Sequence, residues 1–117
     1  MSLSNENEEF THYILDLMQG VGPVISKRMF GGYGIFIDGL MFAIISDGLL
    51  YLKVDSENEM EFISRHSTPF TYLKKGKTCK LSYYQSPEEA LEEVDIMFIW
   101  ANSAYAAARR AAAKKLK

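Results

Sequence analysis

Three side chains in this sequence carry the chemistry of soft metal ligands and nucleophiles: Cys79, His12 and His66. A zinc site needs several such residues at short spacings, and a catalytic Cys–His pair needs the two side chains within hydrogen-bonding reach. These three are far apart in the chain and fall in different expected elements. We therefore expect no metal site and no catalytic pair, and we interpret Cys79 as a small, half-buried strand residue.

A glycine-rich segment, Gly31-Gly32-Tyr33-Gly34, has the composition of a phosphate-binding loop. Such a loop needs a strand before it and a helix N-terminus after it, whereas a further strand is expected to follow here. A tight bend or bulge at the start of a sheet explains the glycines better. The acidic run over residues 88–93 is typical of a solvated face. No nucleophile, base and acid can be assembled, so we expect no enzyme and no cofactor.

Aromatic and basic residues are interleaved between residues 70 and 84. Stacking on aromatic rings, combined with lysine charge, holds single-stranded nucleic acid. Strands also need aromatic residues for cross-strand packing, and we favour this structural interpretation because the acidic surroundings would repel phosphate. The aromatic residues are Phe70, Tyr72, Tyr83 and Tyr84, and the basic residues are Lys74, Lys75, Lys77 and Lys80.

The charge of the chain is divided unevenly. The 117 residues have a formal net charge of −2, from 13 basic and 15 acidic side chains. Residues 109–117 hold five of the basic side chains and no acid, so residues 1–108 carry a net charge of −7. This basic end fits either the favourable interaction of cations with a helix C-terminus or an electrostatic contact with DNA.

The composition excludes several classes of protein. With 48% apolar residues and a small net charge, the chain is not of the disordered class. It has no apolar stretch of about 18 residues, no secretory signal and only one cysteine. We therefore expect one cytoplasmic domain over residues 1–117, with no membrane contact. Residues 1–5 are expected to be flexible or carried over from cloning, and residues 109–117 to form a basic helix end or tail.

The first half of the chain predicts one helix and a small sheet. Apolar residues recur at helical spacing over residues 6–19, where we expect an amphipathic helix. Two pairs, Asp38-Gly39 and Asp47-Gly48, favour type I′ turns and divide residues 33–54 into a three-stranded antiparallel meander. A preceding strand is expected through residues 27–30.

A short second helix and a second hairpin are expected next. Asp55 or Ser56 is positioned to cap the helix, which should end before Pro69. The hairpin then covers residues 70–84, with lysines at its tip. The expected apolar positions of the helix are Met60, Phe62 and Ile63.

The C-terminal region is expected to be helical in two parts. Ser86 as N-cap and Pro87 at the first helical position open a short turn, and Asp95 caps a longer helix. Two apolar stripes make this helix apolar on nearly all sides near Trp100, which indicates contacts on two sides. One stripe contains Leu91, Val94, Phe98, Ala101, Tyr105 and Ala108, and the other contains Met97, Trp100 and Ala104.

Together these elements predict an α+β fold in two layers. We expect an antiparallel sheet of about five to six strands with helices packed against it, in the order α-β-β-β-β-α-β-β-α-α.

Several short motifs occur together in this order. The first three are Met29-Phe30-Gly31-Gly32-Tyr33-Gly34-Ile35-Phe36, Phe42-Ala43 and Leu50-Tyr51-Leu52-Lys53-Val54-Asp55. Pro69-Phe70-Thr71-Tyr72, Tyr83-Tyr84-Gln85-Ser86-Pro87 and the helix containing Trp100 follow. In combination they resemble the N-terminal domain of the TfoX/Sxy family, over about residues 8–112. The residues that carry this structural motif are Phe30, Gly31, Gly32, Gly34, Pro69, Phe70, Tyr72, Tyr83 and Pro87.

This resemblance implies a curved antiparallel sheet with helices packed against it. It also implies a positive regulator of DNA uptake and transformation genes that assists the cyclic-AMP receptor protein at certain promoters. The family is not known for enzymes, and the resemblance supplies no catalytic residues. Its best characterised members carry a second, C-terminal domain, whereas this sequence ends just after the long helix.

Three functions remain open at this point. The leading hypothesis is a regulatory domain that contacts transcription machinery, with Trp100, Tyr105, Arg109 and Arg110 as candidate contact residues. A core position explains Trp100 more readily, because aromatic side chains dominate buried surface. The alternatives are direct DNA binding through residues 109–117 and a small-molecule pocket between sheet and helices. A homodimer through an edge strand or the alanine-rich helix is also left open.

Overall fold

The computed structural model of the chain describes residues 3–29 and 31–116, and side chains from Asn7 onward in the first of these ranges. The elements follow the predicted order, and the α+β prediction is confirmed. Phe30 of the glycine-rich motif lies outside the described residues. The elements are α1 (Leu3–Leu17), β1 (Ile25–Met29), β2 (Gly32–Ile37), β3 (Leu40–Ser46), β4 (Leu49–Lys53), α2 (Glu59–Ile63), β5 (Pro69–Lys74), β6 (Lys77–Gln85), the 3-10 helix η1 (Glu88–Leu91) and α3 (Val94–Lys115).

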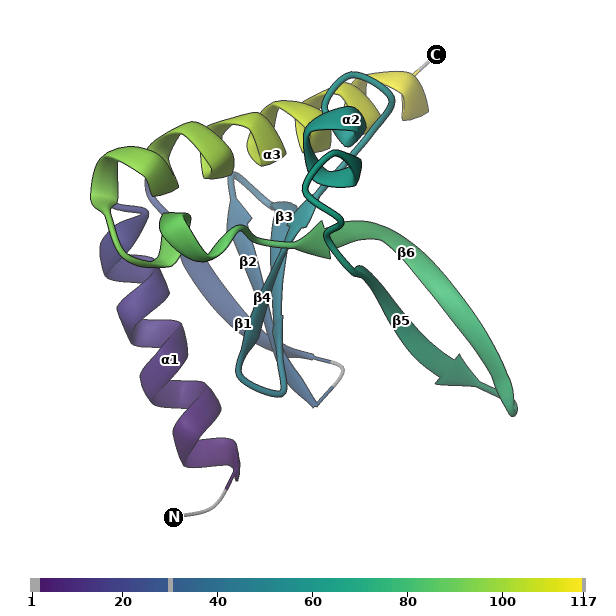
Figure 1. The fold of residues 1–117 in the computed structure, drawn as a ribbon, viewed down its shortest axis with the longest axis horizontal. Helices are drawn as coiled ribbons and strands as arrows, with labels where there is room; N and C mark the ends of the chain where they lie inside the picture. The colour runs from purple at the N-terminus through teal and green to yellow at the C-terminus, as the bar shows by residue number, and fades with distance from the viewer. Residues whose placement is uncertain (1–2, 30, 117) are drawn as a thin grey trace.

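The six strands form one antiparallel sheet in the order β1-β2-β3-β4-β6-β5. The chain leaves the meander after β4, forms α2, and returns with β5 on the outer edge and β6 beside β4. Pro69 is the first residue of the edge strand β5, a position where the absence of an N–H donor costs the sheet little. In Figure 1, α3 crosses one end of the strands, and the β5–β6 hairpin extends away from the helices.

The two Asp-Gly turns have the backbone geometry that the sequence predicts. Asp38 and Gly39 have φ values of 50° and 78°, and Asp47 and Gly48 have values of 52° and 73°. Positive φ at both central residues defines a type I′ turn, whose twist matches that of the flanking strands. These two turns set the register of β2, β3 and β4.

The glycines of the motif serve the sheet rather than a phosphate. Gly31 has a φ of 74° at the turn between β1 and β2. Gly32 lies within β2, where a Cβ atom would stand 1.9 Å from the carbonyl oxygen of Ile45 on β3. At Gly34 the same atom would stand 2.4 Å from the Met29 sulfur. Gly31 thus provides the predicted tight bend. The close contact of Gly32 with the β3 backbone also requires glycine and was not predicted, whereas the atoms near Gly34 are side-chain ends that can shift.

The main core lies between one face of the sheet and the helices. Ile14 of α1 and Met18, just after this helix, pack with strand residues such as Ile35 and Leu52, all of them buried. Most of the buried side chains of α3 are small. They are Ala101, Ala104, Ala107 and Ala108, and the two larger ones are Met97 and Trp100. A second cluster of Ile44, Phe70 and Tyr83 packs apart from the main core.

Several predicted helix boundaries are wrong in detail. The first helix covers Leu3–Leu17 instead of residues 6–19. The second helix begins after Asn58, and Asp55 instead accepts a hydrogen bond from the Glu57 N–H within the preceding turn. Of its three expected apolar positions only Phe62 is buried, because a helix of five residues directs few positions inward. Met60 and Ile63 are exposed.

The expected caps of the C-terminal helices are also wrong. Pro87 itself precedes the 3-10 helix, and the Ser86 hydroxyl donates to the Pro87 carbonyl instead of capping a helix N–H. Glu93 occupies the N-cap position of α3, so Asp95 lies inside the first turn. Its charge still interacts favourably with the helix dipole at that position. The predicted arrangement of a short turn followed by a longer helix is confirmed.

The contact at Gly32 leads to a stability prediction. Gly32→Ala places a methyl group against a carbonyl that is held in the β2–β3 pairing, so the backbone must shift. We expect the free energy of unfolding in urea to fall by about 2 kcal/mol or more. Gly20→Ala is the control, because no atom lies within 4 Å of its Cβ position. A Gly32→Ala protein as stable as the control would contradict this account.

Candidate functional site

Trp100, the first candidate contact residue, is 8% exposed and lies in the main core. Its ring meets the Phe62 ring edge-on, with 5.1 Å between centroids. The guanidinium of Arg65 lies 5.0 Å from the Trp100 centroid. Trp100 therefore joins α3 to α2 and leaves little surface for a partner.

Tyr105 and Arg109 lie one turn apart on α3. Tyr105 is half-buried and meets the Phe42 ring edge-on at 5.7 Å. The Arg109 guanidinium is 5.9 Å from the Tyr105 centroid, and Arg109 is exposed. Of these two, Arg109 offers its charge to solvent, whereas Tyr105 mainly supports the packing of the helix on the sheet.

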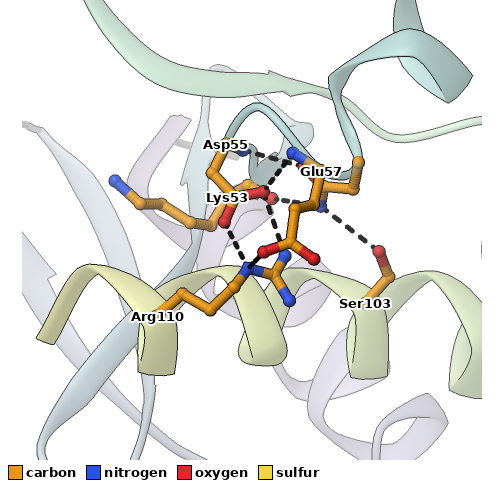
Figure 2. Close-up of polar contacts among 6 residues, drawn as sticks. Lys53, Asp55, Glu57, Ser103 and Arg110 are labelled. Atoms are coloured by element: carbon orange, nitrogen blue, oxygen red, sulfur yellow. Dashed lines mark hydrogen bonds and ion pairs between the residues drawn. The ribbon is translucent and has the colours of Figure 1, made fainter. Parts of the chain in front are cut away.

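Arg110 holds the loop after β4 against α3 (Figure 2). Its Nε donates to Oδ2 of Asp55 at 2.6 Å, and an Nη donates to Oδ1 at 3.0 Å. The same Nε lies 3.0 Å from a carboxylate oxygen of Glu57. This hydrogen bonding lowers the pKa of Asp55 and raises the pKa of Arg110. The guanidinium is thus engaged within the chain.

Asn58 stabilises this loop through hydrogen bonds of its side chain. Its side-chain oxygen accepts the N–H of Asp55 at 2.8 Å. Its amide nitrogen donates to the Lys53 carbonyl and to the Ser103 hydroxyl of α3, both at 3.2 Å. Asn58 is buried, so these bonds satisfy polar atoms that would otherwise be costly to bury. No local sequence signal indicates this role of Asn58, since an asparagine beside a helix start normally indicates only a cap.

The outer side of α3 exposes a group of apolar residues near its N-terminal end. Val94, Phe98 and Ile99 are 53%, 39% and 66% exposed. Val94 and Phe98 are four positions apart and lie on the same face of the helix. Near Trp100 the helix therefore has contacts within the chain on one side only, instead of the predicted two. Its other side is apolar and exposed, and we call it the outer α3 face.

A second distinctive surface is the β5–β6 hairpin. Residues 67–87 contain no acid, and the hairpin extends from the body of the molecule (Figure 1). Phe70 and Tyr83 are buried in the second cluster, where the Phe70 ring lies 5.0 Å from that of Tyr51. These aromatic side chains therefore serve packing. The lysines of the hairpin, all exposed, are Lys74, Lys75, Lys77 and Lys80.

Within residues 3–29 and 31–116, no three His, Cys, Asp or Glu side chains come together as a metal site would require. Cys79 is a free, half-buried strand residue. Among the described helices, none has the length and apolar character needed to cross a membrane.

Comparison with known proteins identifies the family. The TfoX N-terminal domain matches residues 16–108 of this chain. The chain belongs to the TfoX N-terminal domain family. The match covers most of the sequence, from the last two residues of α1 to Ala108 in α3, and the resemblance to the TfoX/Sxy competence regulators is confirmed.

Two curated relatives support this assignment. Protein Sxy of Escherichia coli strain K12 is 31% identical over 68 residues, which are 58% of this chain and 32% of that protein. DNA transformation protein TfoX1 of Aliivibrio fischeri is 27% identical over 88 residues, which are 75% of this chain and 40% of that protein. The chain thus matches two fifths or less of the length of these relatives.

The Arg110–Asp55 pair is expected to contribute to stability. In a double-mutant cycle of Arg110→Gln and Asp55→Asn, urea unfolding should give a coupling energy of about 1 kcal/mol at neutral pH. Because Arg110 lowers the pKa of Asp55, this coupling is fully present at pH values above 3.8, the ordinary pKa of an aspartate. It should disappear as the pH falls through the lowered pKa.

The Arg65–Glu89 pair is the matched control for this cycle. Its atoms are 2.7 Å apart, but both side chains are 44% exposed. Solvent screens such a pair, so its cycle should show little coupling. Equal coupling for the two pairs, or a coupling of Arg110 and Asp55 that is unchanged in acid, would contradict the assigned role.

Proposed function

We propose that this TfoX N-terminal domain is a non-enzymatic regulator of competence and transformation genes that acts in the cytoplasm through protein contact. The partner is a component of the transcription machinery, and the family resemblance favours the cyclic-AMP receptor protein. Family membership supports the regulatory role, and one of the relatives is named a DNA transformation protein.

The observation that carries the contact mechanism is the outer α3 face. Three large apolar side chains, Val94, Phe98 and Ile99, are exposed together on a helix whose opposite side is held in the core. Exposed apolar groups of this kind are typical of protein-binding surfaces. A rigid helix also presents them without a large ordering cost on binding.

The test replaces Phe98 and Ile99 together by serine and measures binding to the purified cyclic-AMP receptor protein by calorimetry. Loss of two central apolar contacts is expected to weaken binding about 30-fold or more. Transcription of a competence promoter in cells that lack the native gene should fall in parallel.

Leu73→Ser supplies the control, because Leu73 is 75% exposed but lies on the hairpin, away from α3. Its binding and transcription should match those of the unaltered protein. Full binding by the Phe98 and Ile99 variant, or no binding by the unaltered protein, would overturn the proposed contact.

A second candidate function is contact with DNA. The β5–β6 hairpin is a better candidate for this contact than the basic C-terminal end of α3. Arg110 of the basic end is already paired with Asp55 and Glu57. The hairpin instead carries four exposed lysines without an acid on its strands. The major groove of DNA admits a two-stranded β-ribbon, and lysines bind phosphate without regard to sequence.

Two matched sets of substitutions test the DNA contact. Lysines 74, 75 and 77 are changed together to glutamine in one protein, and Arg109, Lys114 and Lys115 in another. Fluorescence anisotropy with a labelled duplex at about 50 mM salt should show weaker binding and a lower salt slope for the hairpin variant alone. A loss confined to the other variant would assign DNA contact to α3, and no binding by the unaltered protein would end the idea.

A further inference from the structure

A cavity of about 350 Å³ lies where the C-terminal part of α3 passes one end of the sheet. Its volume is within the range of small-molecule sites. Most of its walls are apolar, and no Asp or Glu is among the lining residues. The apolar lining includes Phe36, Leu40 and Ala112, and the polar lining residues are Lys53, Tyr83 and Lys115.

Lys53 reaches this cavity from β4. In Figure 2 its side chain points away from the Asp55–Arg110 pair, in the direction in which α3 runs from Ser103 to Arg110. Its ammonium lies 5.1 Å from the centroid of the Tyr83 ring. Burial, with a further contribution from Lys115, lowers the pKa of Lys53. Lys53 is thus a partly buried cation, whereas Lys115 beside it is exposed near the end of α3.

The carboxylate of Asp55 does not fully compensate the charge of Lys53. Asp55 raises the pKa of Lys53, but burial and Lys115 outweigh this effect. Both carboxylate oxygens of Asp55 are already bonded to Arg110. The Arg110 clamp therefore leaves the lysines of the cavity with an excess of positive charge.

Tyr83 adds a neutral hydroxyl group to the lining of the cavity. Its hydroxyl donates to the Met41 carbonyl at 3.2 Å. Burial raises the pKa of Tyr83 to about 12, so the hydroxyl remains protonated and adds no negative charge at neutral pH. The cavity therefore combines an apolar lining, a neutral hydroxyl and two ammonium groups.

We propose that this cavity binds an organic anion with a compact apolar body. Its charged group would pair with Lys53 and Lys115, and its body would contact Phe36, Leu40 and the alanines of α3. Such a ligand would bridge the sheet and the C-terminal part of α3. This site is separate from the outer α3 face and does not depend on the proposed protein contact.

The test compares octanoate with 1-octanol, which has the same number of carbon atoms but no charge. Each is titrated into the full chain labelled with ¹⁵N, and amide shifts are followed by NMR. Octanoate should bind at least about tenfold more tightly than 1-octanol and shift the amides of Met41, Lys53 and Ala112. Equal affinity for the two probes, or shifts located elsewhere, would overturn the proposal.

Substitutions on adjacent positions of α3 provide the matched controls. Lys115→Gln should weaken octanoate binding about three- to tenfold, whereas Lys114→Gln, outside the cavity, should leave it unchanged. Ala112→Leu keeps a strong helix former and narrows the cavity, so it should also weaken binding. Equal effects at Lys114 and Lys115, or full affinity in the Ala112→Leu protein, would contradict a ligand seated there.

Discussion

The close packing of α3 on the sheet is the constraint on which the rest of the structure depends. Ala101, Ala104, Ala107 and Ala108 are buried along one side of this helix. Their small side chains let the helix axis approach the strands, and larger side chains would separate the two layers. This packing brings Trp100 over Phe62 and Arg110 to Asp55, closes one side of the cavity and turns Val94, Phe98 and Ile99 toward solvent.

The packing of α3 also determines which basic side chains remain available to a partner. The last nine residues carry five cations against a body with a net charge of −7. Arg110 is not available to an external partner, because it neutralises Asp55 and Glu57 of the loop after β4. Arg110 of the basic end therefore stabilises the position of an acidic loop instead of contacting a partner. The largest group of lysines on adjacent strands lies instead on the β5–β6 hairpin, which extends away from the helices (Figure 1).

Local sequence signals predicted the architecture well. The Asp-Gly pairs set the meander and Gly31 provides the expected bend, because both features depend on backbone geometry within a few residues. The close contact of Gly32 with Ile45 on β3 could not be predicted in this way, since it depends on how the strands pair. The Asp55–Arg110 pair could not be predicted, since its partners are 55 positions apart and meet only through the packing of α3. The role of Asn58 and the grouping of Lys53 with Lys115 depend on the same tertiary arrangement.

Amide hydrogen exchange, resolved by residue, tests most directly whether α3 is held on the sheet as described. Exchange that requires global unfolding is a property of elements packed into the core, whereas loosely attached elements open locally. We expect the amides from Met97 to Arg110 to exchange as slowly as those of β3. Rapid exchange over this part of α3, with β3 still protected, would show that the helix opens independently and would contradict the account.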